Sequence, residues 1–288
     1  MSVELAIIGA GRTGRALGRL ARAAGYAIGP IVCRTRAHAE EAVRFIGGGR
    51  AGTAPEGSEL TLLAVPDGEI VAAAREARLP KGAVLAHTCA AYPAELLRPH
   101  GPAGAIHPLR SFADPARAAE QFAGTACAID GDPETVDALE RLARSIGGLP
   151  LRVRSDRKAL YHAGAVFASN YVVAALESAL RLFEEAGIAR AEALPALASL
   201  AEGTLANVRA AGIPGALTGP VERGDAETLR RHVAELAKRA PGLAGAYAAM
   251  ARIAIEVALA KGTLDRAAAG RLNAALGTVE SVGAVVDR

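Results

Sequence analysis

An apolar stretch near the start of the chain runs into three glycines, in "VELAIIGAGRTGRALGRLARAAG". Gly9, Gly11 and Gly14 have the spacing GxGxxG, directly after a predicted strand and at the start of a predicted helix over residues 13–24. Such glycines permit a tight turn, and the first helical turn offers unpaired N–H groups to a pyrophosphate. The pattern predicts an α/β domain that binds a dinucleotide; a glycine turn without a ligand is the alternative. The residues expected around the phosphates are Gly9, Ala10, Gly11, Arg12, Thr13 and Gly14.

The end of the next strand predicts which dinucleotide binds. An NAD site usually carries Asp or Glu there to hold the ribose hydroxyls, whereas a 2′-phosphate needs cationic and hydroxyl donors. The sequence "VCRTRA" places Arg34, Thr35 and Arg36 at this point. Because a guanidinium group matches phosphate oxygens, these residues favour NADP(H) over NAD(H). A solvated basic turn in an Arg-rich chain is the alternative.

Secondary-structure patterns divide the chain into two parts. Up to Ser155, short apolar runs such as "ELTLLAVPD", "AVLAHT", "AGAIHPL" and "TACAID" alternate with helical stretches. This alternation is typical of a doubly wound parallel sheet. After Ser155 the pattern is helix after helix, with ends marked by Gly and Pro. We therefore predict a Rossmann domain over residues 1–155 and an all-α domain over residues 156–288, with one crevice between them as the default site.

Further candidate residues follow the predicted strands. Val65 and Pro66 stand where a ligand at the switch point of the sheet would lie, and we expect them beside the nicotinamide ribose. Asp67 is better explained as the N-cap of the following helix. Thr88 follows a strand end and could donate a hydrogen bond to substrate or cofactor, with turn capping as the alternative. His87 and His107 are weaker candidates for the same site.

A polar row lies on the first helix of the second part, "KALYHAGAVFASNYVVAALESALRLF", predicted as one helix over residues 158–183. Lys158, His162, Val166 and Asn170 follow one another at intervals of four residues, which places them in one row along a helix. His162 suits a proton donor near neutral pH, which the reduction of a C=O or C=N bond requires. Asn170 needs a tertiary partner in mid-helix, where its propensity is poor. The alternative is a core helix whose His162 is satisfied by a backbone carbonyl.

Composition excludes several classes of protein. Lys and Arg number 33 against 30 Asp and Glu, a net charge of +3 that is spread along the chain, and aromatic residues are scarce, which argues against nucleic-acid binding. Three distant cysteines without CxxC spacing argue against a metal site and against disulfides. No uninterrupted apolar run reaches membrane-spanning length, and no leader pattern precedes the glycine turn. A soluble cytoplasmic protein without a membrane partner is the expectation.

The motifs, taken in order, resemble Rossmann-like NADP oxidoreductase relatives that carry a helical C-terminal domain of unknown function, DUF2520. The resembling pieces are "GAGRTGRALG", "VCRTRA", "AVPDGEI", "AHTCAAYPAELL", "GAIHPLRSF", "YHAGAVFASNYVVAAL" and "ALTGPVERGD". More distantly, the layout is similar to hydroxyisobutyrate dehydrogenases, pyrroline-carboxylate reductases and ketopantoate reductases. The resemblance implies an NADP-binding domain, a helical domain like the C-terminal part of 6-phosphogluconate dehydrogenase that often forms a homodimer, and a substrate pocket between the two.

Two positions depart from these families. The families commonly read His-Thr-Ser-Gly after the fifth strand, whereas this chain has Cys89 and Ala90 at the last two places. Hydroxyisobutyrate-type relatives carry a catalytic Lys four residues before an Asn, whereas the residue four before Asn170 is Val166. The family-specific loop with Thr218, Gly219 and Pro220 belongs to a dimer contact, a pocket rim or, more simply, a structured turn between helices.

These observations predict an NADP(H)-dependent oxidoreductase that acts on a small carbonyl, imine or hydroxyl compound. In this hypothesis His162 gives or takes the proton, and Asn170 and Thr88 hold the polar atom of the substrate. The alternative is a non-catalytic NADP(H)-binding sensor or assembly protein, for which the Val at position 166 is the best argument.

Overall fold

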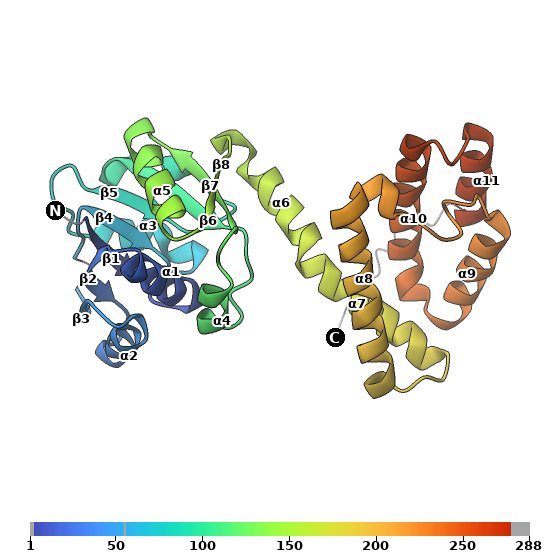
Figure 1. Ribbon diagram of the computed structural model, residues 1–288, viewed down its shortest axis with the longest axis horizontal. Coiled ribbons are helices and arrows are strands. Elements are labelled where there is room, and N and C mark those ends of the chain that lie inside the picture. Colours follow the sequence, from blue (N-terminus) through green and yellow to red (C-terminus); the bar gives the residue numbers. More distant parts are fainter. Residues whose placement is uncertain (1–2, 55, 278–288) are drawn as a thin grey trace. The chain divides into compact units, whose positions relative to one another are not determined.

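The computed structural model describes residues 3–54 and 56–277, shown in Figure 1. The chain forms two compact units, Met1–Asn170 and Tyr171–Arg288. The first contains all the described strands, and the second consists of helices joined by turns. The prediction of an α/β domain followed by a helical domain is confirmed. The last described strand ends at Arg152 and helices follow it, and the first compact unit extends to Asn170.

The first unit is built on one eight-stranded sheet. Its strands are β1 (Glu4–Ile8), β2 (Ala27–Val32), β3 (Arg50–Gly52), β4 (Leu60–Leu63), β5 (Val84–His87), β6 (Ala103–Pro108), β7 (Ala126–Gly131) and β8 (Leu149–Arg152), in the order β3-β2-β1-β4-β5-β6-β7-β8. All neighbouring strands are parallel except β6 and β7. The predicted parallel sheet is thus confirmed with one antiparallel pairing.

Two apolar cores lie on opposite faces of this sheet. Helices α1 (Arg12–Ala23), α2 (Arg36–Ile46) and α5 (Pro133–Ser145) bury residues in one core, and α3 (Ile70–Glu76) with the 3₁₀ helix η2 (Ala94–His100) in the other. The short helix α4 (Pro115–Glu120) contacts α1. Along β4, Leu62 belongs to the first core and Leu63 to the second, because successive side chains of a strand point to opposite faces.

The carboxyl ends of the central parallel strands lie side by side. The register pairs Ile8 of β1 with Leu63 of β4, and Leu63 with His87 of β5. His87 pairs with Ala105 of β6, so His107 stands two residues further toward the same edge. The segments that follow these strands therefore meet at one edge of the sheet, where ligands of doubly wound folds bind.

The helix predicted over residues 158–183 is broken, so this prediction was wrong. The short 3₁₀ helix η3 (Ser155–Arg157) leads into α6 (Lys158–Ala168), and α7 (Asn170–Glu185) follows. Another 3₁₀ helix, η1 (Asp67–Glu69), precedes α3 in the first unit. Ser169 between them has φ −129° and ψ −74°, outside the helical region. Asn170 consequently begins a helix instead of lying in the middle of one. Helix α6 belongs to the first unit because Lys158 and Tyr161 bond to its strands.

The second unit packs its helices around a core rich in alanine. Its further helices are α8 (Arg190–Ala216), α9 (Ala226–Arg239), α10 (Pro241–Lys261) and α11 (Arg266–Leu276). Helices α9, α10 and α11 bury a shared cluster that includes Leu229, Ile255 and Leu272. A smaller cluster around Leu180 joins α7 to α8. The turn before α9 ends at Asp225. Its carboxylate caps the helix by accepting a hydrogen bond from the N–H of Thr228 at 3.0 Å.

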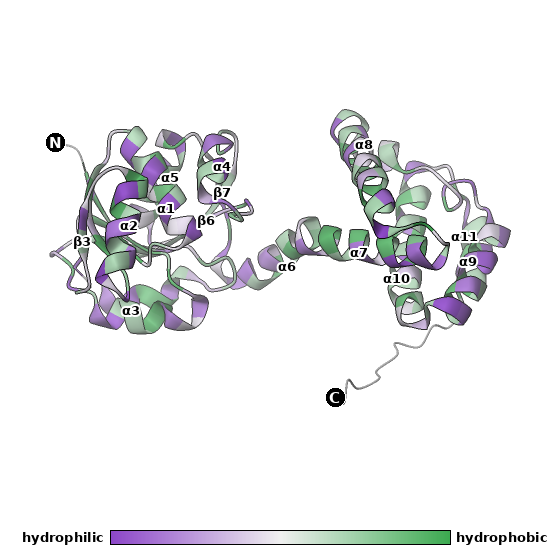
Figure 2. Ribbon diagram, turned by 90° about the horizontal axis from the view of Figure 1, so that it is seen from below, coloured by the Kyte–Doolittle hydropathy of each residue, from purple (hydrophilic) through white to green (hydrophobic). Residues whose placement is uncertain are grey.

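Long apolar faces remain exposed on the helices. The helical stretches Ser155–Glu185 and Pro241–Lys261 are long and apolar enough to cross a membrane by length and composition, and only 6% and 22% of their most apolar windows are buried. Figure 2 shows the hydrophobic colouring along α6, α7 and α10. Large exposed hydrophobic side chains continue on α8, where Leu200 is 67% and Ile213 63% exposed. Core helices of soluble proteins pass the same test of length and composition.

Candidate functional site

The turn after β1 has the backbone geometry that its glycines permit. Gly9 has φ +90°, in the left-handed region that favours glycine, and a side-chain carbon there would lie 2.6 Å from Cγ1 of Val65. A side-chain carbon on Gly14 would lie 2.4 Å from the carbonyl oxygen of Gly9. A side chain on Gly11 would meet open space instead. The turn is therefore packed against the end of β4 on one side and open on the other.

The open space at Gly11 lies at the start of α1. Gly11 is the N-cap of this helix, and no side chain among the described residues caps it, nor does its first turn contain an acidic residue. The first N–H groups of a helix have no partner within the helix, so those at Arg12, Thr13 and Gly14 are available to an anion. The guanidinium group of Arg15 is already bonded, since its Nε donates to the carbonyl of Ala10 and its Nη1 to Glu41.

The basic cluster predicted to select NADP(H) follows β2. Arg34 is exposed, and Arg36 pairs with Glu40 one turn along α2 at 2.9 Å. The hydroxyl of Thr35 accepts a hydrogen bond from the N–H of His38 at 3.3 Å and so caps α2. Thr35 thus has a structural role, while both arginines lie at the solvent-exposed end of β2.

The segment after β4 borders the glycine turn. Val65 packs partly buried against the second core, and Pro66 is exposed. Asp67 is not the N-cap of the next helix, contrary to the sequence prediction, because Pro66 occupies that place and η1 has no side-chain cap among the described residues. The carboxylate of Asp67 instead lies near Cys89 and His107. Burial raises the pKa of Cys89 and Asp67 raises it further, whereas burial lowers the pKa of His107 and Asp67 opposes that lowering.

The loop after β5 is held rigidly by His87. The imidazole is fully buried; its Nδ1 accepts a hydrogen bond from the N–H of Cys89 at 3.2 Å, which leaves Nε2 to donate to the carbonyl of Pro93 at 3.3 Å. Burial lowers the pKa of His87, and the nearby Lys158 ammonium lowers it further. Thr88 lies at the start of this loop, half-buried, with its N–H bonded to the carbonyl of Leu63.

A buried ion pair ties this loop to β7 and α6. Nζ of Lys158 donates to Oδ1 of Asp130 at 2.8 Å and to the carbonyl of Cys89 at 3.3 Å. Oδ2 of Asp130 accepts from the N–H of Ala94 at 2.9 Å and from the hydroxyl of Ser155 at 3.2 Å. Lys158, one member of the predicted polar row, therefore holds the loop in place, and its ammonium group is buried with both partners.

Tyr161, on the next turn of α6, pairs with His107 of β6. Nδ1 of His107 and the Tyr161 hydroxyl oxygen lie 2.8 Å apart, and the rings meet edge to face with centroids 5.8 Å apart. Burial, reinforced by the positive charge of Lys158 and by His162, lowers the pKa of His107 to about 4. Burial raises the pKa of Tyr161 to about 12. Both groups are therefore neutral at neutral pH.

The remaining residues of the predicted row differ in their surroundings. His162 lies beside this pair, partly buried, and its Nδ1 is buried without a hydrogen-bond partner among the described residues. Asn170 is exposed at the start of α7. The structure thus brings Thr88, His107, Tyr161 and His162 to the edge of the sheet that carries the glycine turn, and Asn170 stands apart from their hydrogen bonds.

These features fit a bound dinucleotide. The open space at Gly11, the uncapped start of α1 and the exposed arginines after β2 match the phosphate and ribose groups of such a cofactor. The polar cluster stands along the same edge, and its orphaned Nδ1 of His162 offers a hydrogen-bonding position to a further ligand. No group of His, Cys, Asp and Glu within residues 3–54 and 56–277 could hold a metal ion.

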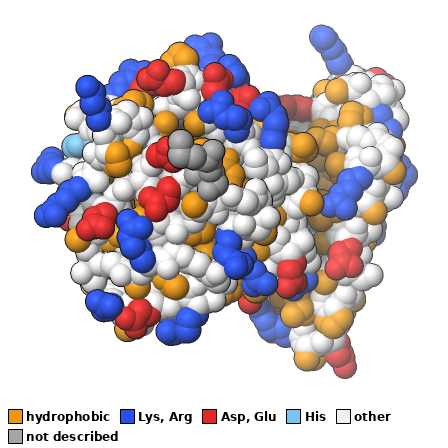
Figure 3. All heavy atoms as spheres, turned by 60° about the vertical axis from the view of Figure 1, so that its left-hand side comes forward, with side chains coloured by type: hydrophobic (Ala, Val, Ile, Leu, Met, Phe, Trp, Pro, Cys, Tyr) orange, Lys and Arg blue, Asp and Glu red, His pale blue; other side chains and the backbone are white. Residues whose placement is uncertain are grey.

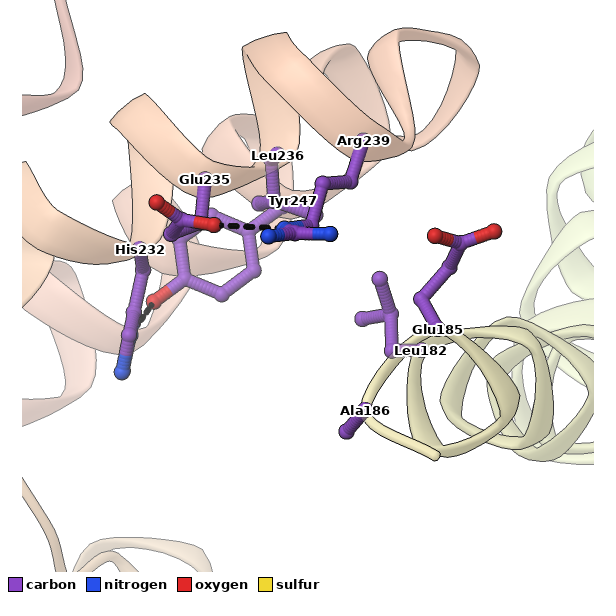
Figure 4. Close-up of a pocket in the computed structure, with 8 residues that line it drawn as sticks. All are labelled: Leu182, Glu185, Ala186, His232, Glu235, Leu236, Arg239 and Tyr247. Atoms are coloured by element: carbon purple, nitrogen blue, oxygen red, sulfur yellow. Dashed lines mark hydrogen bonds and ion pairs between the residues drawn. The ribbon is translucent and has the colours of Figure 1, made fainter. Parts of the chain in front are cut away.

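The helical unit has cavities of its own. One of about 610 Å³ lies between α7 and the helices α9 and α10. Figure 4 shows that His232 points to the hydroxyl of Tyr247, 2.7 Å away, while Arg239 pairs with Glu235. A second cavity, of about 810 Å³, is lined by α8, Val257 and the turn that begins at Leu217.

The family-specific turn after α8 is well ordered by its own bonds. Lys261 donates to the carbonyl of Leu217 and pairs with Glu222, and the N–H of Asp225 donates to the carbonyl of Pro220 at 2.9 Å. Gly219 has φ +95°, and Thr218 lines the larger cavity. The structure accords with the simplest interpretation, a structured turn between helices.

Two family models match successive parts of the chain. Residues 1–110 match the family described as Rossmann-like domain, and residues 125–254 match the domain of unknown function DUF2520. The chain carries a Rossmann-like domain and a DUF2520 domain. The DUF2520 match begins at β7, so it supplies Asp130, Lys158, Tyr161 and His162, whereas the Rossmann-like match supplies the glycine turn and His107. The polar cluster is therefore assembled from both family segments within the first unit.

Solved structures with the same fold span nearly the whole chain. Protein TM1727 from Thermotoga maritima is 27% identical, with 90% of this chain and 99% of that chain covered and a TM-score of 0.74. The protein named "putative NADP oxidoreductase BF3122" from Bacteroides fragilis is 21% identical, with coverages of 88% and 98% and a TM-score of 0.70. A 1-pyrroline-5-carboxylate reductase from Streptococcus pyogenes is 15% identical, with coverages of 90% and 99% and a TM-score of 0.63. None of the curated proteins matches the chain.

Sequence reasoning missed Tyr161 and Asp130 as members of this region. Tyr161 precedes His162 in a family-specific motif, but its partner His107 is 54 residues away. His107 and Tyr161 lie in the motifs "GAIHPLRSF" and "YHAGAVFASNYVVAAL", on which the family resemblance rests. Their common membership of family motifs was the only signal available, because chain separation hides the contact.

Charges on the surface are mixed. On the face drawn in Figure 3, Lys and Arg side chains stand among Asp and Glu, with hydrophobic atoms between them. The described residues on this face do not form the continuous basic field by which nucleic-acid-binding proteins attract phosphates. The pattern agrees with the even spread of charge along the sequence.

Proposed function

We propose that this protein is a cytoplasmic NADP(H)-dependent oxidoreductase acting on a small carbonyl, imine or hydroxyl compound. The observation that carries the proposal is the pairing of an open glycine turn, before an uncapped helix, with a neutral His–Tyr pair at the same edge of the sheet. A turn alone would suit any nucleotide. A proton-bearing cluster beside it suits a hydride transfer that is accompanied by a proton.

The cofactor-binding part of the proposal rests on the first two strand ends. The N–H groups at the start of α1 would hold the pyrophosphate, and Val65 with Pro66 would border the nicotinamide ribose. Arg34 and Arg36 would contact the 2′-phosphate, for which an exposed guanidinium is well suited. The similarity of the fold to the putative NADP oxidoreductase from Bacteroides fragilis supports the choice of NADP.

The chemical part of the proposal rests on the polar cluster. NADPH, when bound, supplies the hydride. The chain would hold the substrate's oxygen or nitrogen by hydrogen bonds from Thr88 and His162, provide a proton, and exclude water from the reacting atoms. Asn170 would bind the substrate only at its outer end, because its side chain is exposed at the start of α7.

The partner in this proposal is a second copy of the chain. Single side chains such as Leu200, Leu205 and Ile213 on α8 are more than half exposed, and Met250 on α10 is 57% exposed. Association sites on soluble proteins are apolar surfaces, and we assign these exposed side chains to one. A homodimer would cover these helices. The free thiols of Cys33, Cys89 and Cys127 suit a reducing compartment.

Cofactor titration tests the proposal directly. NADPH and NADH binding would be followed by the fluorescence of the reduced nicotinamide, in the wild-type protein and in Arg34→Ala. Loss of one charge-assisted contact, worth about 1.5–3 kcal/mol, should weaken NADPH binding roughly 10- to 100-fold and leave NADH binding unchanged. Arg44→Ala, exposed at the far end of α2, is the control and should change neither. Equal affinity of the wild-type protein for both cofactors would contradict the proposed specificity.

A further inference from the structure

We propose that Tyr161 is the proton donor of this site and that His107 passes the proton to it. The inference rests on the proposed oxidoreductase function and names the groups that complete the reaction. Nδ1 of His107 is 2.8 Å from the Tyr161 hydroxyl oxygen, a normal hydrogen-bond distance, and the rings meet at 79°. One residue comes from β6 and the other from α6, so the contact fixes the first turns of α6 over the strand ends.

The charge states of the pair decide how it can work. With the pKa of His107 lowered to about 4 and that of Tyr161 raised to about 12, neither an imidazolium nor a phenolate is favoured at neutral pH. The titratable groups that act on His107 are Lys158 and His162 from α6, which oppose its protonation, and Asp67 from η1, which favours it. If both groups are to stay neutral during the transfer, each of them must receive a proton as it releases its own.

Such a transfer balances without a further reactant. The substrate carbon receives the hydride, and the Tyr161 O–H bond breaks as a new O–H or N–H bond forms on the substrate. The Nδ1–H bond of His107 breaks to restore the Tyr161 hydroxyl, while Nε2 takes a proton from water. His107 ends as the other neutral tautomer, and exchange with water resets it. His107 is partly exposed, which gives water access to the ring.

His162 is less suited to the same task. Its Nδ1 is buried without a partner among the described residues, so no hydrogen bond is in place there to resupply a proton once it is given away. The Tyr161 hydroxyl, in contrast, is already bonded to a group that can replace its proton. His162 is accordingly assigned to binding of the substrate's polar atom.

A neutral proton donor is useful only for substrates that need a proton in addition to the hydride. A ketone, an aldehyde or an unprotonated imine needs a proton as well as a hydride. An N-alkylated iminium ion carries its positive charge already and needs only the hydride. The pair should therefore matter for the first class and be dispensable for the second, a difference that a purely structural role of Tyr161 would not produce.

The chain contains a matched control for this pair. His232 and Tyr247 form the same contact in the helical unit, at 2.7 Å with ring centroids 5.8 Å apart. They line the cavity between α7, α9 and α10, as Figure 4 shows, and belong to the other compact unit. Tyr247→Phe thus removes an identical hydroxyl–imidazole bond from a place with no assigned chemistry.

The experiment compares Tyr161→Phe, Tyr247→Phe, His107→Asn and His162→Gln with the wild-type protein. NADPH oxidation would be measured with a panel of aldehydes, ketones and cyclic imines, and with N-methyl-1-pyrrolinium. Tyr161→Phe should lower kcat about 100-fold for carbonyls, as expected for a lost general acid, and leave the iminium rate within about 3-fold. His107→Asn, which keeps a donor toward Tyr161 but cannot relay a proton, should show the same selective loss. Tyr247→Phe should match the wild-type protein on both.

A second readout does not depend on turnover. Nitrogen-15 NMR of the His107 ring should show a neutral imidazole from pH 5 to 9 and a changed Nδ1 shift in Tyr161→Phe, with no change in Tyr247→Phe. A His107 ring that titrates near pH 6.5 would overturn the relay.

Each kinetic outcome has one meaning. Equal loss of carbonyl and iminium reduction in Tyr161→Phe, or a selective loss confined to His162→Gln, would overturn the relay and leave the oxidoreductase function standing. No turnover by the wild-type protein on the whole panel, with NADPH bound, would overturn the proposed function and the relay with it.

Discussion

Replacement of Lys158 by Met should destabilise the first unit more than any exposed charge does. Lys158 and Asp130 have side chains 1% and 2% exposed, and their charged atoms are 2.8 Å apart. Met removes the ammonium group but keeps most of the apolar stem. It leaves the Asp130 carboxylate buried with only the N–H of Ala94 and the hydroxyl of Ser155 as donors. The carbonyl of Cys89 loses a donor at the same time.

The expected loss in the free energy of unfolding is about 3–5 kcal/mol, the range for breaking a buried ion pair on one side. This is a large share of the roughly 5–15 kcal/mol that stabilises a typical domain. A lone buried carboxylate can be neutralised by taking up a proton, and each pH unit makes that uptake about 1.4 kcal/mol easier or harder. The loss should therefore be smaller at pH 5 than at pH 7.

Hydrogen exchange of the β7 amides measures this loss within the first unit itself. Arg154→Met is the control, because Arg154 and Asp156 are 74% and 55% exposed and such pairs contribute about 0–1 kcal/mol. The double variant Lys158→Met, Asp130→Leu should recover more than 1 kcal/mol of the loss, since no charge remains buried. A loss in Lys158→Met no greater than in Arg154→Met, or one that grows as the pH falls, would refute the reasoning.

Three further outcomes test other parts of the structure. Gly9→Ala should lower the free energy of unfolding by more than about 1 kcal/mol and weaken NADPH binding at least 10-fold. The reason is that φ is +90° and the new methyl group would lie 2.6 Å from Val65. Unchanged NADPH binding in a fluorescence titration would contradict the role of the glycine turn. Because its pKa is lowered to about 4, His107 binds fewer protons in the folded state than in the unfolded state. The free energy of unfolding should therefore fall as the pH drops from 6.5 to 4, by at most roughly 3.4 kcal/mol, and the urea midpoints of His107→Asn should depend less on pH. Leu200→Glu should turn a dimer into a monomer in sedimentation velocity because Leu200 is 67% exposed, and a wild-type protein that sediments as a monomer would end the dimer proposal.

Local patterns predicted much of the first unit because they depend on neighbouring residues alone. The glycine spacing predicted the turn, its backbone geometry and the helix after it, and Gly9 has the positive φ that such a turn requires. The alternation of strands and helices predicted the doubly wound sheet, since each apolar run must be covered by the helix that follows it. The antiparallel pairing of β6 with β7 was not predicted, because strand direction depends on the connection between them and not on their composition.

Predictions that needed contacts between distant residues were less successful. The i, i+4 row on the predicted long helix assumed one continuous helix, but the backbone breaks at Ser169 and leaves Asn170 exposed. Lys158 was a candidate for the site, yet its partner Asp130, far away in the chain, turns it into the core. Periodicity places a residue on a helix face and says nothing about which strand that face meets.

The sequence by itself determined the glycine turn, the alternation of strands and helices, and the basic end of β2, because each follows from spacing within a few residues. Only the tertiary structure decided which polar side chains share the edge of the sheet. His107 and Tyr161 meet because parallel strands align their carboxyl ends and because the buried Lys158–Asp130 pair anchors the first turn of α6 above them. Burial at that meeting point sets both pKa values, and burial is a property of the packed fold.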